Sequence, residues 1–527
     1  MKQFRPYQIE CVKAIQASWR KNEHCIAVVA TGGGKTFIAA GTTSLVQSNG
    51  GGRVLFLANR NELCHQPFEA FTELLGYAPA LEKAESYAPL DARVVIASVQ
   101  TISRKKRLER FPQDHFDFVF ADECHMSVAA SWKRIFEHFQ SAKRCGITAT
   151  PFRSDGKKLT DLFTTEAYRK GLFDLVDDGY LVNPDHVDKL STAISLAQVR
   201  VKHTTEGIDY DVVDAANAIE PYFIEIAKEL KERHSERHIL AFLPLVASSK
   251  KFVACCVAQG LNAVHIDGED PERDQKLESF KRGEITLLSN ANLLHTGVDM
   301  PVCDATLNLR PTKSKVLYQQ VVGRSTRTVP GIIDGLYSTA DRLHAIANSS
   351  KPRAWIIDPL WLTSDHDLVT PSFLIAENQE EANEMNARAG KSYSLRALHS
   401  QVQVDREEAM RRRLEATAKF REGRLDAQYF AAATANHSLV NYEAVYAWEA
   451  APATKFSCLL LEKAGIDPAS VSGEGHARAV LRAIGRRRYL GLCEIRDLAP
   501  CAEAGITELW DLRKPDVARR LKEACGT

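Results

Sequence analysis

The sequence predicts an α/β protein with two tandem lobes, each built on a parallel sheet, followed by a small and mostly helical C-terminal region. A short apolar strand leads into a glycine-rich loop and a helix over 26–45. Strands alternate with helices again over 238–309, and this alternation is typical of parallel sheets, whose strands need crossover connections. From about residue 365 the composition becomes more charged and the apolar spacing thinner.

Length and composition limit the classes of protein that fit. The chain has 527 residues, 45% hydrophobic and 26% charged, so about three or four globular domains are expected. Its formal net charge is +1, so any nucleic-acid surface must be a local basic patch. The twelve cysteines contain no C-x-x-C pair, which favours reduced cytoplasmic thiols and no zinc site. The sequence has no apolar run of about 18 residues, so we expect neither a membrane span nor a signal peptide.

The first lobe is organised around a loop between an apolar strand at 26–29 and a helix at 37–45. The loop consists of Thr31, Gly32, Gly33, Gly34, Lys35 and Thr36. Glycines let backbone N–H groups approach phosphate oxygens, and the helix N-terminus adds partial positive charge. We therefore predict a cradle for the phosphates of ATP, with Lys35 on the β- and γ-phosphates and Thr36 on Mg²⁺. A plain glycine-rich turn before a helix is the weaker alternative.

An acidic pair, Asp122 and Glu123, follows the apolar strand at 116–121. A doubly wound sheet places its chemistry at the carboxyl ends of its strands. We predict that Asp122 holds Mg²⁺, directly or through water, and that Glu123 is the base that orients the attacking water. An acidic turn that caps a helix is the alternative, which the upstream loop disfavours.

The region after the first lobe is harder to interpret. We expect a strand over 175–184 at the end of that lobe and a polar connector over 185–220. In the second lobe, Arg324 and Arg327 are three residues apart, so a helix would carry them on one face. Two guanidinium groups so placed could reach the γ-phosphate across the interface between the lobes, as arginine fingers do. A basic surface helix is the alternative.

Several of these stretches follow one another in a recognisable order over residues 1–360. They are the Gly-Lys-Thr loop, Asp-Glu-Cys-His at 122–125, the segments 145–151 and 293–301, and Gln-x-x-Gly-Arg-x-x-Arg at 320–327. Together they resemble superfamily 2 DEAD/DEAH-box helicases, and among these the RadD-type bacterial repair helicases and their phage-encoded relatives. The resemblance implies two RecA-like P-loop NTPase lobes, ATP and Mg²⁺ as ligands, and ATP hydrolysis coupled to translocation along or unwinding of nucleic acid.

The resemblance also implies roles that spacing alone leaves open. Arg5-Pro6-Tyr7-Gln8, by itself a turn before a helix, is similar to the adenine-reading Q motif, in which Gln8 would bond the adenine edge and Arg5 or Tyr7 would pack near the ring. Within 293–301, Gly297 would permit a close approach and Asp299 would lie near the ribose or the Mg²⁺ water.

Two further stretches resemble motifs Ia and Ib, which line the path of a single strand. Their donors for phosphate oxygens would be Arg60, Gln100 and Thr101. The basic run at 104–107 follows directly, and phosphate contact is about as plausible there as a solvated face.

The predicted segments are lobe one at 1–184, the connector at 185–220, lobe two at 221–365, a charged helical linker at 366–450 and a helical accessory module at 451–527. In the module, Arg486, Arg487 and Arg488 stand in the most basic helix. We expect this module to raise nucleic-acid affinity or to recruit a protein partner. RadD-type relatives carry clustered cysteines after the second lobe, and this chain departs from them there.

The predicted function is an ATP-dependent helicase or translocase in a bacterial cell or phage-infected host, acting on DNA rather than RNA, in repair, recombination or phage replication. An RNA helicase, the motor of a restriction or defence complex, and an ATP-gated clamp that does not separate strands remain alternatives. The sequence has no nuclease constellation, so cleavage would need a partner. Because the catalytic residues are split between lobes, hydrolysis should be slow until nucleic acid favours closure.

Overall fold

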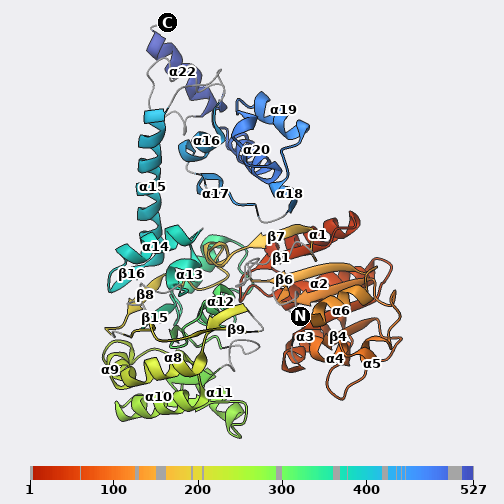
Figure 1. Ribbon diagram of the computed structural model, residues 1–527, viewed down its shortest axis with the longest axis vertical. Helices are drawn as coiled ribbons and strands as arrows, with labels where there is room; N and C mark the ends of the chain where they lie inside the picture. The colour runs from red at the N-terminus through yellow and green to blue at the C-terminus, as the bar shows by residue number, and fades with distance from the viewer. Residues whose placement is uncertain are drawn as a thin grey trace. The chain divides into compact units, whose positions relative to one another are not determined.

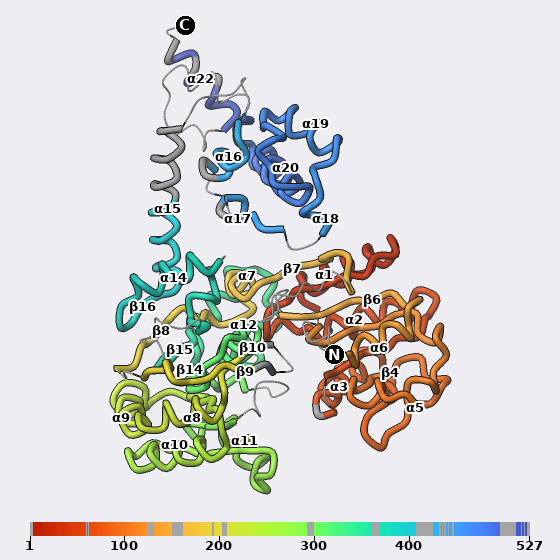
Figure 2. Tube along the Cα trace, viewed as in Figure 1, coloured from red at the N-terminus to blue at the C-terminus, as the bar shows by residue number. Residues whose placement is uncertain are grey.

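The computed structural model describes most of the chain, and Figure 2 traces its path. The described residues are 4–59, 61–124, 130–149, 162–191, 194–204, 207–291, 300–359, 368–376, 378–417, 425–434, 436–440, 442–444, 447–495 and 513–525. The chain divides into two compact units, Met1–Leu398 and His399–Thr527.

The first unit contains two seven-stranded sheets and a two-stranded hairpin, and the strands of the first large sheet all pair in parallel. Their order is β3 (Ala80–Glu82), β4 (Val94–Ser98), β2 (Val54–Ala58), β5 (Phe118–Asp122), β6 (Lys143–Thr148), β1 (Cys25–Val29) and β7 (Thr165–Lys170). The helices that accompany it are α1 (Pro6–Arg20), α2 (Lys35–Ser48), α3 (His65–Leu75), α4 (Val99–Ile102), α5 (Lys105–Leu108), α6 (Ala130–His138) and α7 (Leu172–Asp177).

Both faces of the first sheet are covered, which explains why its inner strands are continuously apolar. Along β2 the side chains alternate between two hydrophobic clusters. Val54 and Phe56 pack in the cluster that contains residues of α1 and α2, whereas Leu55 and Leu57 pack in the cluster that contains residues of α6. Period-two alternation therefore places every residue of this strand in a core.

The second sheet also has seven strands. Their order is β12 (Ala263–Ile266), β13 (Leu287–Ala291), β11 (Ile239–Leu243), β14 (Ala305–Asn308), β15 (Trp355–Asp358), β8 (His186–Lys189) and β16 (Ser392–Ser394). Only β16 is antiparallel to its neighbour, and Figure 1 shows β15, β8 and β16 together. The helices of this lobe are α8 (Val212–Ile219), α9 (Phe223–His234), α10 (Val246–Ala258), α11 (Arg273–Lys281), α12 (Lys315–Val322), α13 (Thr339–Ala347) and α14 (Gln379–Arg388). The two predicted lobes with parallel sheets are confirmed.

The strand predicted over 175–184 is wrong. A helix, α7, covers Leu172–Asp177, and the Asp174 carboxylate accepts the Gly171 N–H at 2.8 Å, which begins the helix. Beyond it the chain turns at Gly179, whose φ of +71° favours glycine.

The polar connector expected over 185–220 also differs. Its first residues form β8, and a hairpin of β9 (Val201–Thr204) and β10 (Gly207–Tyr210) follows. Two residues of β8, Asp188 and Lys189, are charged but buried. Asp188 forms an ion pair with Arg233, and His234 Nε2 lies 2.9 Å from its other oxygen. Buried, paired charges gave this strand the composition of a surface segment.

The second unit is helical, as predicted. Its helices are α16 (Ala427–Ala433), α17 (His437–Val440), α18 (Ala447–Ala450), α19 (Lys455–Lys463), α20 (Glu474–Tyr489) and α22 (Lys514–Cys525), and α15 (Leu395–Thr417) runs into it from the first unit. Phe430, Leu461 and Val480 lie at the centre of its core and are fully buried. Near its start, α15 buries Leu395, Leu398 and Val402.

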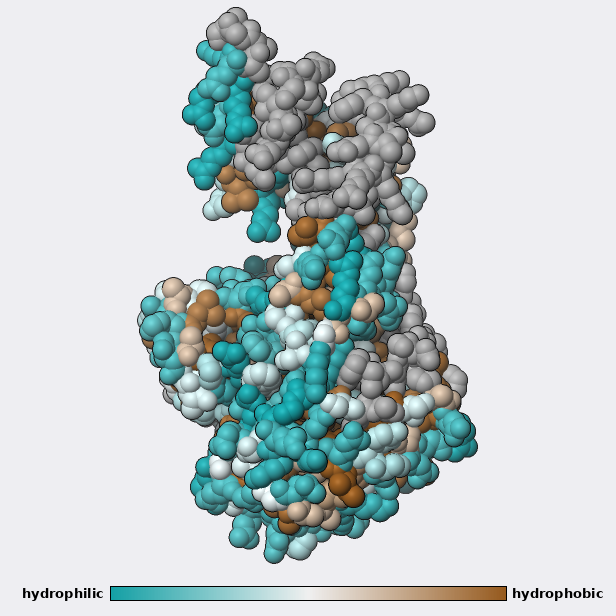
Figure 3. Space-filling model, turned by 90° about the vertical axis from the view of Figure 1, so that its left-hand side faces the viewer, coloured by the Kyte–Doolittle hydropathy of each residue, from teal (hydrophilic) through white to brown (hydrophobic). Residues whose placement is uncertain are grey.

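The face of the second lobe seen in Figure 3 is mostly hydrophilic, with small separate apolar patches. Within the described part of the chain, no helix is both long and apolar enough to cross a membrane.

Candidate functional site

The glycine-rich loop joins the carboxyl end of β1 to the start of α2. Gly32 and Gly34 have φ values of +86° and +76°, which side-chain-bearing residues rarely adopt. A Cβ on Gly34 would lie 2.5 Å from Gln8 Nε2, and one on Gly33 would lie 2.5 Å from Val29 Cγ1. Only glycine fits these positions, so the loop has the bare backbone that a phosphate cradle requires.

Lys35, Asp122 and Glu123 meet beside this loop. Lys35 Nζ lies 3.2 Å from Glu123 Oε1, and both side chains are largely buried. Asp122 ends β5, two strands from β1, and its Oδ1 accepts the Glu123 N–H at 3.1 Å. Burial, followed by the charge of Glu123, raises the pKa of Asp122 to about 7, and the Lys35 ammonium opposes this shift. The predicted lysine and acidic pair therefore form one cluster.

Thr31 and Thr36 flank the lysine cluster along the loop. Thr31 Oγ1 is buried and has no hydrogen-bond partner among the described residues. Thr36 lies in the first turn of α2. An orphaned hydroxyl beside a bare glycine backbone fits a loop that awaits a polar ligand such as a triphosphate. Nearby, Thr148 is fully buried at the end of β6.

The N-terminal segment contacts the same loop. The Tyr7 hydroxyl donates to the Gly33 carbonyl at 2.8 Å, and Gln8 Nε2 donates to the same oxygen at 3.3 Å. Gln8 Oε1 accepts the Arg5 N–H at 3.0 Å. The bond from the Tyr7 hydroxyl to the loop was not predicted, because the sequence offered Tyr7 only as a ring that could pack near adenine. The adenine-reading role of Gln8 and Arg5 stays a prediction.

Arg324 and Arg327 do not lie on a helix, so that prediction is wrong. Helix α12 ends at Val322, and the Ser325 and Thr326 hydroxyls donate back to the carbonyls of Val322 and Gly323. These bonds turn the chain out of the helix.

The turn nevertheless brings the second lobe to the loop. A Cβ on Gly323 would lie 2.7 Å from Thr31 Cβ, and one on Gly32 would lie 4.0 Å from Arg327 Cγ. Arg324 is 4% exposed. Both predicted arginines therefore belong to the segment that packs on the phosphate loop.

The residues predicted to contact nucleic acid differ in their exposure to solvent. Thr101 is 1% exposed, its hydroxyl accepts the Ala84 N–H at 3.1 Å, and it donates to Asn61 Oδ1 at 3.3 Å. This hydroxyl supports the protein rather than facing a phosphate, which corrects the prediction for Thr101. Gln100 is exposed, and its role stays a prediction.

The basic run at 104–107 also contains both buried and exposed residues. Arg107 is buried, its guanidinium lies 2.5 Å from Glu82 Oε1, and it stacks 3.3 Å from the centre of the Tyr87 ring. It is a structural residue, whereas Lys105 and Lys106 are exposed. Arg60, Gly297 and Asp299 lie outside the described residues.

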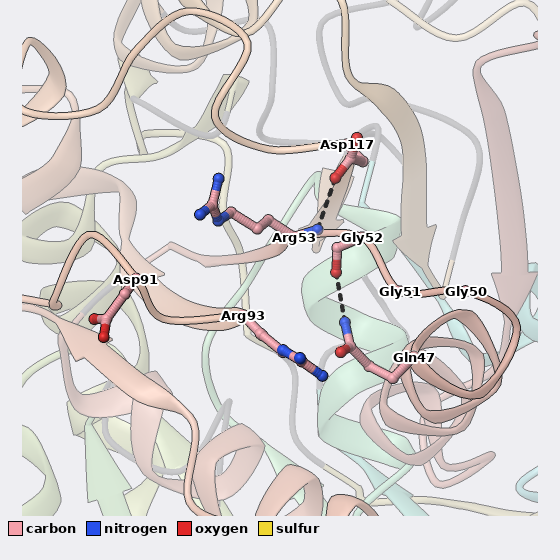
Figure 4. A pocket seen from close by; sticks show the side chains of 8 residues that line it. All are labelled: Gln47, Gly50, Gly51, Gly52, Arg53, Asp91, Arg93 and Asp117. Atoms are coloured by element: carbon pink, nitrogen blue, oxygen red, sulfur yellow. Dashed lines mark hydrogen bonds between the residues drawn. The ribbon is translucent and has the colours of Figure 1, made fainter.

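A pocket elsewhere in the first lobe is separate from this cluster (Figure 4). Its lining residues are Gln47, Gly50, Gly51, Gly52, Arg53, Asp91, Arg93 and Asp117. Gln47 Nε2 donates to the Gly52 carbonyl, and the Arg53 N–H donates to Asp117 Oδ2. Because several of these residues directly precede β2, β4 and β5, the pocket lies at the amino ends of the strands, opposite Asp122.

Two protein families match this chain. Residues 1–153 match the type III restriction enzyme res subunit, and residues 222–329 match the helicase conserved C-terminal domain. The two matched segments coincide with the two parallel-sheet lobes, and the cluster of Lys35, Asp122 and Glu123 lies in the first of them, which supports a superfamily 2 helicase core with two RecA-like lobes.

Two individual relatives are similar to this chain over more than half of its length. A Saccharomyces cerevisiae protein assigned as the ATP-dependent helicase IRC3 is 27% identical over 362 residues, covering 65% of this chain and 51% of the relative. The 51.5 kDa protein of a Lactococcus phage is 29% identical over 299 residues, which cover 56% of this chain and 61% of the phage protein. This chain therefore spans about half to three fifths of the length of these relatives.

A solved structure shows the same fold. It is a fragment assigned as the HsdR subunit of a type I restriction enzyme from Vibrio vulnificus YJ016, 23% identical, with a TM-score of 0.51 over 67% of this chain and 64% of that one. The narrower resemblance to RadD-type repair helicases stays a prediction.

Proposed function

We propose that this chain is an ATP-dependent helicase or translocase that moves along nucleic acid, with DNA as its preferred substrate. One arrangement carries the proposal: Lys35, Asp122 and Glu123 cluster beside a bare glycine loop onto which the second lobe packs. The family, whose members are named as ATP-dependent helicases, supports the use of ATP.

In the proposed reaction the amides of the loop and the Lys35 ammonium bind the β- and γ-phosphates. Thr36 and Asp122 would hold Mg²⁺, which when bound neutralises charge on the phosphate oxygens. Lys35 is now paired with Glu123 at 3.2 Å. Phosphate oxygens would compete for the ammonium, which would leave the Glu123 carboxylate to accept a proton from the attacking water.

Further residues complete the proposed site. Gln8 and Arg5 would recognise adenine, and Gly297 and Asp299 would act at the ribose side. Arg324 and Arg327 would stabilise the charge that develops on the γ-phosphate. A strand that crosses both lobes would favour this closed arrangement, and repeated closure would move the strand.

The segments proposed from the sequence apply with two changes. Residues 186–189 and 392–394 belong to the sheet of the second lobe. Residues 427–439, predicted as part of the charged linker, share a hydrophobic core with the accessory module and are grouped with it. Repair, recombination or phage replication in the cytoplasm of a bacterial cell or infected host is the proposed setting. An RNA helicase and a clamp that does not separate strands remain alternatives within the same chemistry.

A second candidate function is the motor of a restriction or defence complex. The match of residues 1–153 to a restriction enzyme subunit favours it. In that case a partner bound through the C-terminal region would supply any nuclease.

The test measures ATP hydrolysis with single-stranded DNA, duplex DNA and RNA in turn. We expect the strongest stimulation by DNA, and Lys35→Ala should lower turnover by at least about 100-fold, because removal of one transition-state donor costs about that much. Circular dichroism shows whether the variant folds. Turnover of the folded variant within tenfold of wild type would refute the site, and stimulation by RNA alone would refute the substrate. Strand displacement measured beside translocation distinguishes a helicase from a clamp.

A further inference from the structure

Helix α20 of the second unit carries a basic stripe on its exposed side. The stripe consists of Arg478, Arg482, Gly485, Arg486 and Tyr489, all of which are exposed. At 3.6 residues per turn these positions fall within about 100° of one another on the helix. Opposite them, Ala477, Val480 and Ile484 are buried in the core of the unit. The helix therefore buries one side in the core of the unit and exposes the basic stripe on the other.

The neighbouring arginines do not belong to this stripe. Arg487 turns toward the core side, where its guanidinium donates to the Cys493 carbonyl at 3.5 Å. Arg488 pairs with Glu494 at 3.3 Å. The three consecutive arginines that the sequence grouped together thus point in different directions, and only Arg486 joins the stripe.

Two of the three charges in the stripe are available to a ligand. Arg482 and Arg486 form no ion pair with any described residue, whereas Arg478 is held by Glu474 at 2.7 Å. Residues four apart on a helix are separated by a rise of about 6 Å, so the guanidinium groups form an evenly spaced row. A Cβ on Gly485, between them, would meet no atom of the described residues within 4 Å, so a ligand can approach the backbone there.

The stripe ends in an exposed aromatic residue. Tyr489 is 90% exposed and Leu490 after it is 53% exposed, although large apolar side chains are normally covered. A ring beside a row of cations is the combination that single-stranded nucleic acid uses, because bases stack on the ring while arginines neutralise phosphates. An acidic peptide would use the arginines but would gain little from an open ring.

We propose that the Arg482, Gly485, Arg486 and Tyr489 surface of α20 binds single-stranded nucleic acid, as a second contact outside the two lobes. This inference serves the proposed function, but binding is measured without ATP and does not depend on hydrolysis.

The experiment uses the full chain and a fluorescent single-stranded dT oligonucleotide, titrated at several salt concentrations. The variant Arg482→Gln/Arg486→Gln should weaken binding at low salt by about tenfold and lower the salt slope by about 1.4, since each phosphate contact on a single strand contributes about 0.7. Lys455→Gln/Lys463→Gln, which removes two exposed charges from α19 of the same unit, is the matched control and should change neither quantity. An unchanged slope in the α20 variant would overturn the proposal.

Tyr489 is tested separately. Tyr489→Ala should weaken binding roughly five- to a hundredfold with the salt slope unchanged, and Tyr489→Phe should bind like wild type, because only the ring is needed to stack. With iodouracil in the oligonucleotide, light should cross-link the tryptic peptide that begins at Tyr489. Wild-type affinity in Tyr489→Ala together with no adduct on this peptide would overturn the proposal.

Further measurements distinguish DNA, RNA and an acidic protein as the ligand of this surface, and separate a failure of this proposal from a failure of the proposed function. An rU oligonucleotide shows whether the surface takes RNA as well as DNA, and binding of either supports the surface. If polyglutamate alone binds with dependence on Arg482 and Arg486, the partner is an acidic protein and the proposal is wrong. A wild-type chain that cross-links at Tyr489 but lacks DNA-stimulated hydrolysis would refute the proposed function and leave this surface intact.

Discussion

At the scale of single residues, Glu123 has a left-handed backbone, with φ of +49°, at the position predicted for the catalytic base. This conformation costs a residue with a side chain about 1–3 kcal/mol. It sets the Glu123 carboxylate beside Lys35 while Asp122 Oδ1 holds the Glu123 N–H. Strain of this kind persists where the surrounding contacts fix the side chain. The backbone therefore supports Glu123 as an aimed side chain rather than a helix cap.

Glu123→Gln should keep ATP binding and lose hydrolysis by at least about 100-fold, because an amide cannot accept the proton. Turnover and the Kd of a fluorescent ATP analogue measure the two effects, and ATP should tighten nucleic-acid binding by this variant. Glu69→Gln, an exposed residue of α3, should behave like wild type. Loss of ATP binding would instead make Glu123 a structural residue or a metal ligand.

At the scale of elements, short local patterns were predictable and long-range ones were not. The loop and Asp122 follow apolar strands directly, so a few neighbouring residues specify them. Strand β8 was missed because Asp188 and Lys189 are buried through partners far along the chain. The turn at Arg324 was missed because hydroxyls of Ser325 and Thr326 bond back to α12, which spacing alone does not reveal.

A contact between α13 and the exit of the first lobe was also unforeseen. Arg342 donates to the Asp178 carbonyl at 2.8 Å and lies 4.2 Å from the centre of the Tyr180 ring. The centre of the Tyr7 ring lies 5.0 Å from that of the Tyr180 ring, and the Tyr7 hydroxyl donates to the Gly33 carbonyl. A continuous set of contacts therefore joins the second lobe to the phosphate loop.

Arg342→Ala should lower nucleic-acid-stimulated kcat about tenfold and leave the Kd for ATP unchanged, since Arg342 touches no residue of the loop itself. Tyr180→Phe keeps the ring and should behave like wild type. A purely structural Arg342 would lower the melting temperature without changing kcat. Steady-state turnover, nucleotide binding and thermal denaturation measured on the same samples distinguish these cases.

At the scale of the whole molecule, the two lobes already touch near the loop. The Val182 N–H donates to the Thr326 carbonyl at 2.6 Å, and Gly323 packs on Thr31. In addition, the polar connector expected over 185–220 is partly built into the second sheet through β8. Nucleic acid would then need to induce a smaller closing movement of the lobes than the sequence suggested.

Arg327→Ala should flatten the stimulation of ATP hydrolysis by single strands, because a supplied arginine finger is worth about 10³–10⁵ in rate. ATP binding should stay largely intact, since the loop and Lys35 lie in the first lobe. Turnover with and without saturating single strand tests this for wild type and variant. High wild-type turnover without nucleic acid would show that closure needs no strand, and the proposed coupling would be wrong.

The position of β8 has a consequence for biosynthesis. This strand leaves the ribosome directly after the first lobe, but its partners come much later, since His186 pairs with Trp355 and with Ser394. The second sheet therefore cannot be completed until its last edge strand has been translated. Such long-range pairing slows folding, and an unpaired strand can associate with other chains meanwhile. During translation the first lobe would be folded while β8 was still unpaired. At that stage the nascent protein would depend most on chaperones to prevent association with other chains.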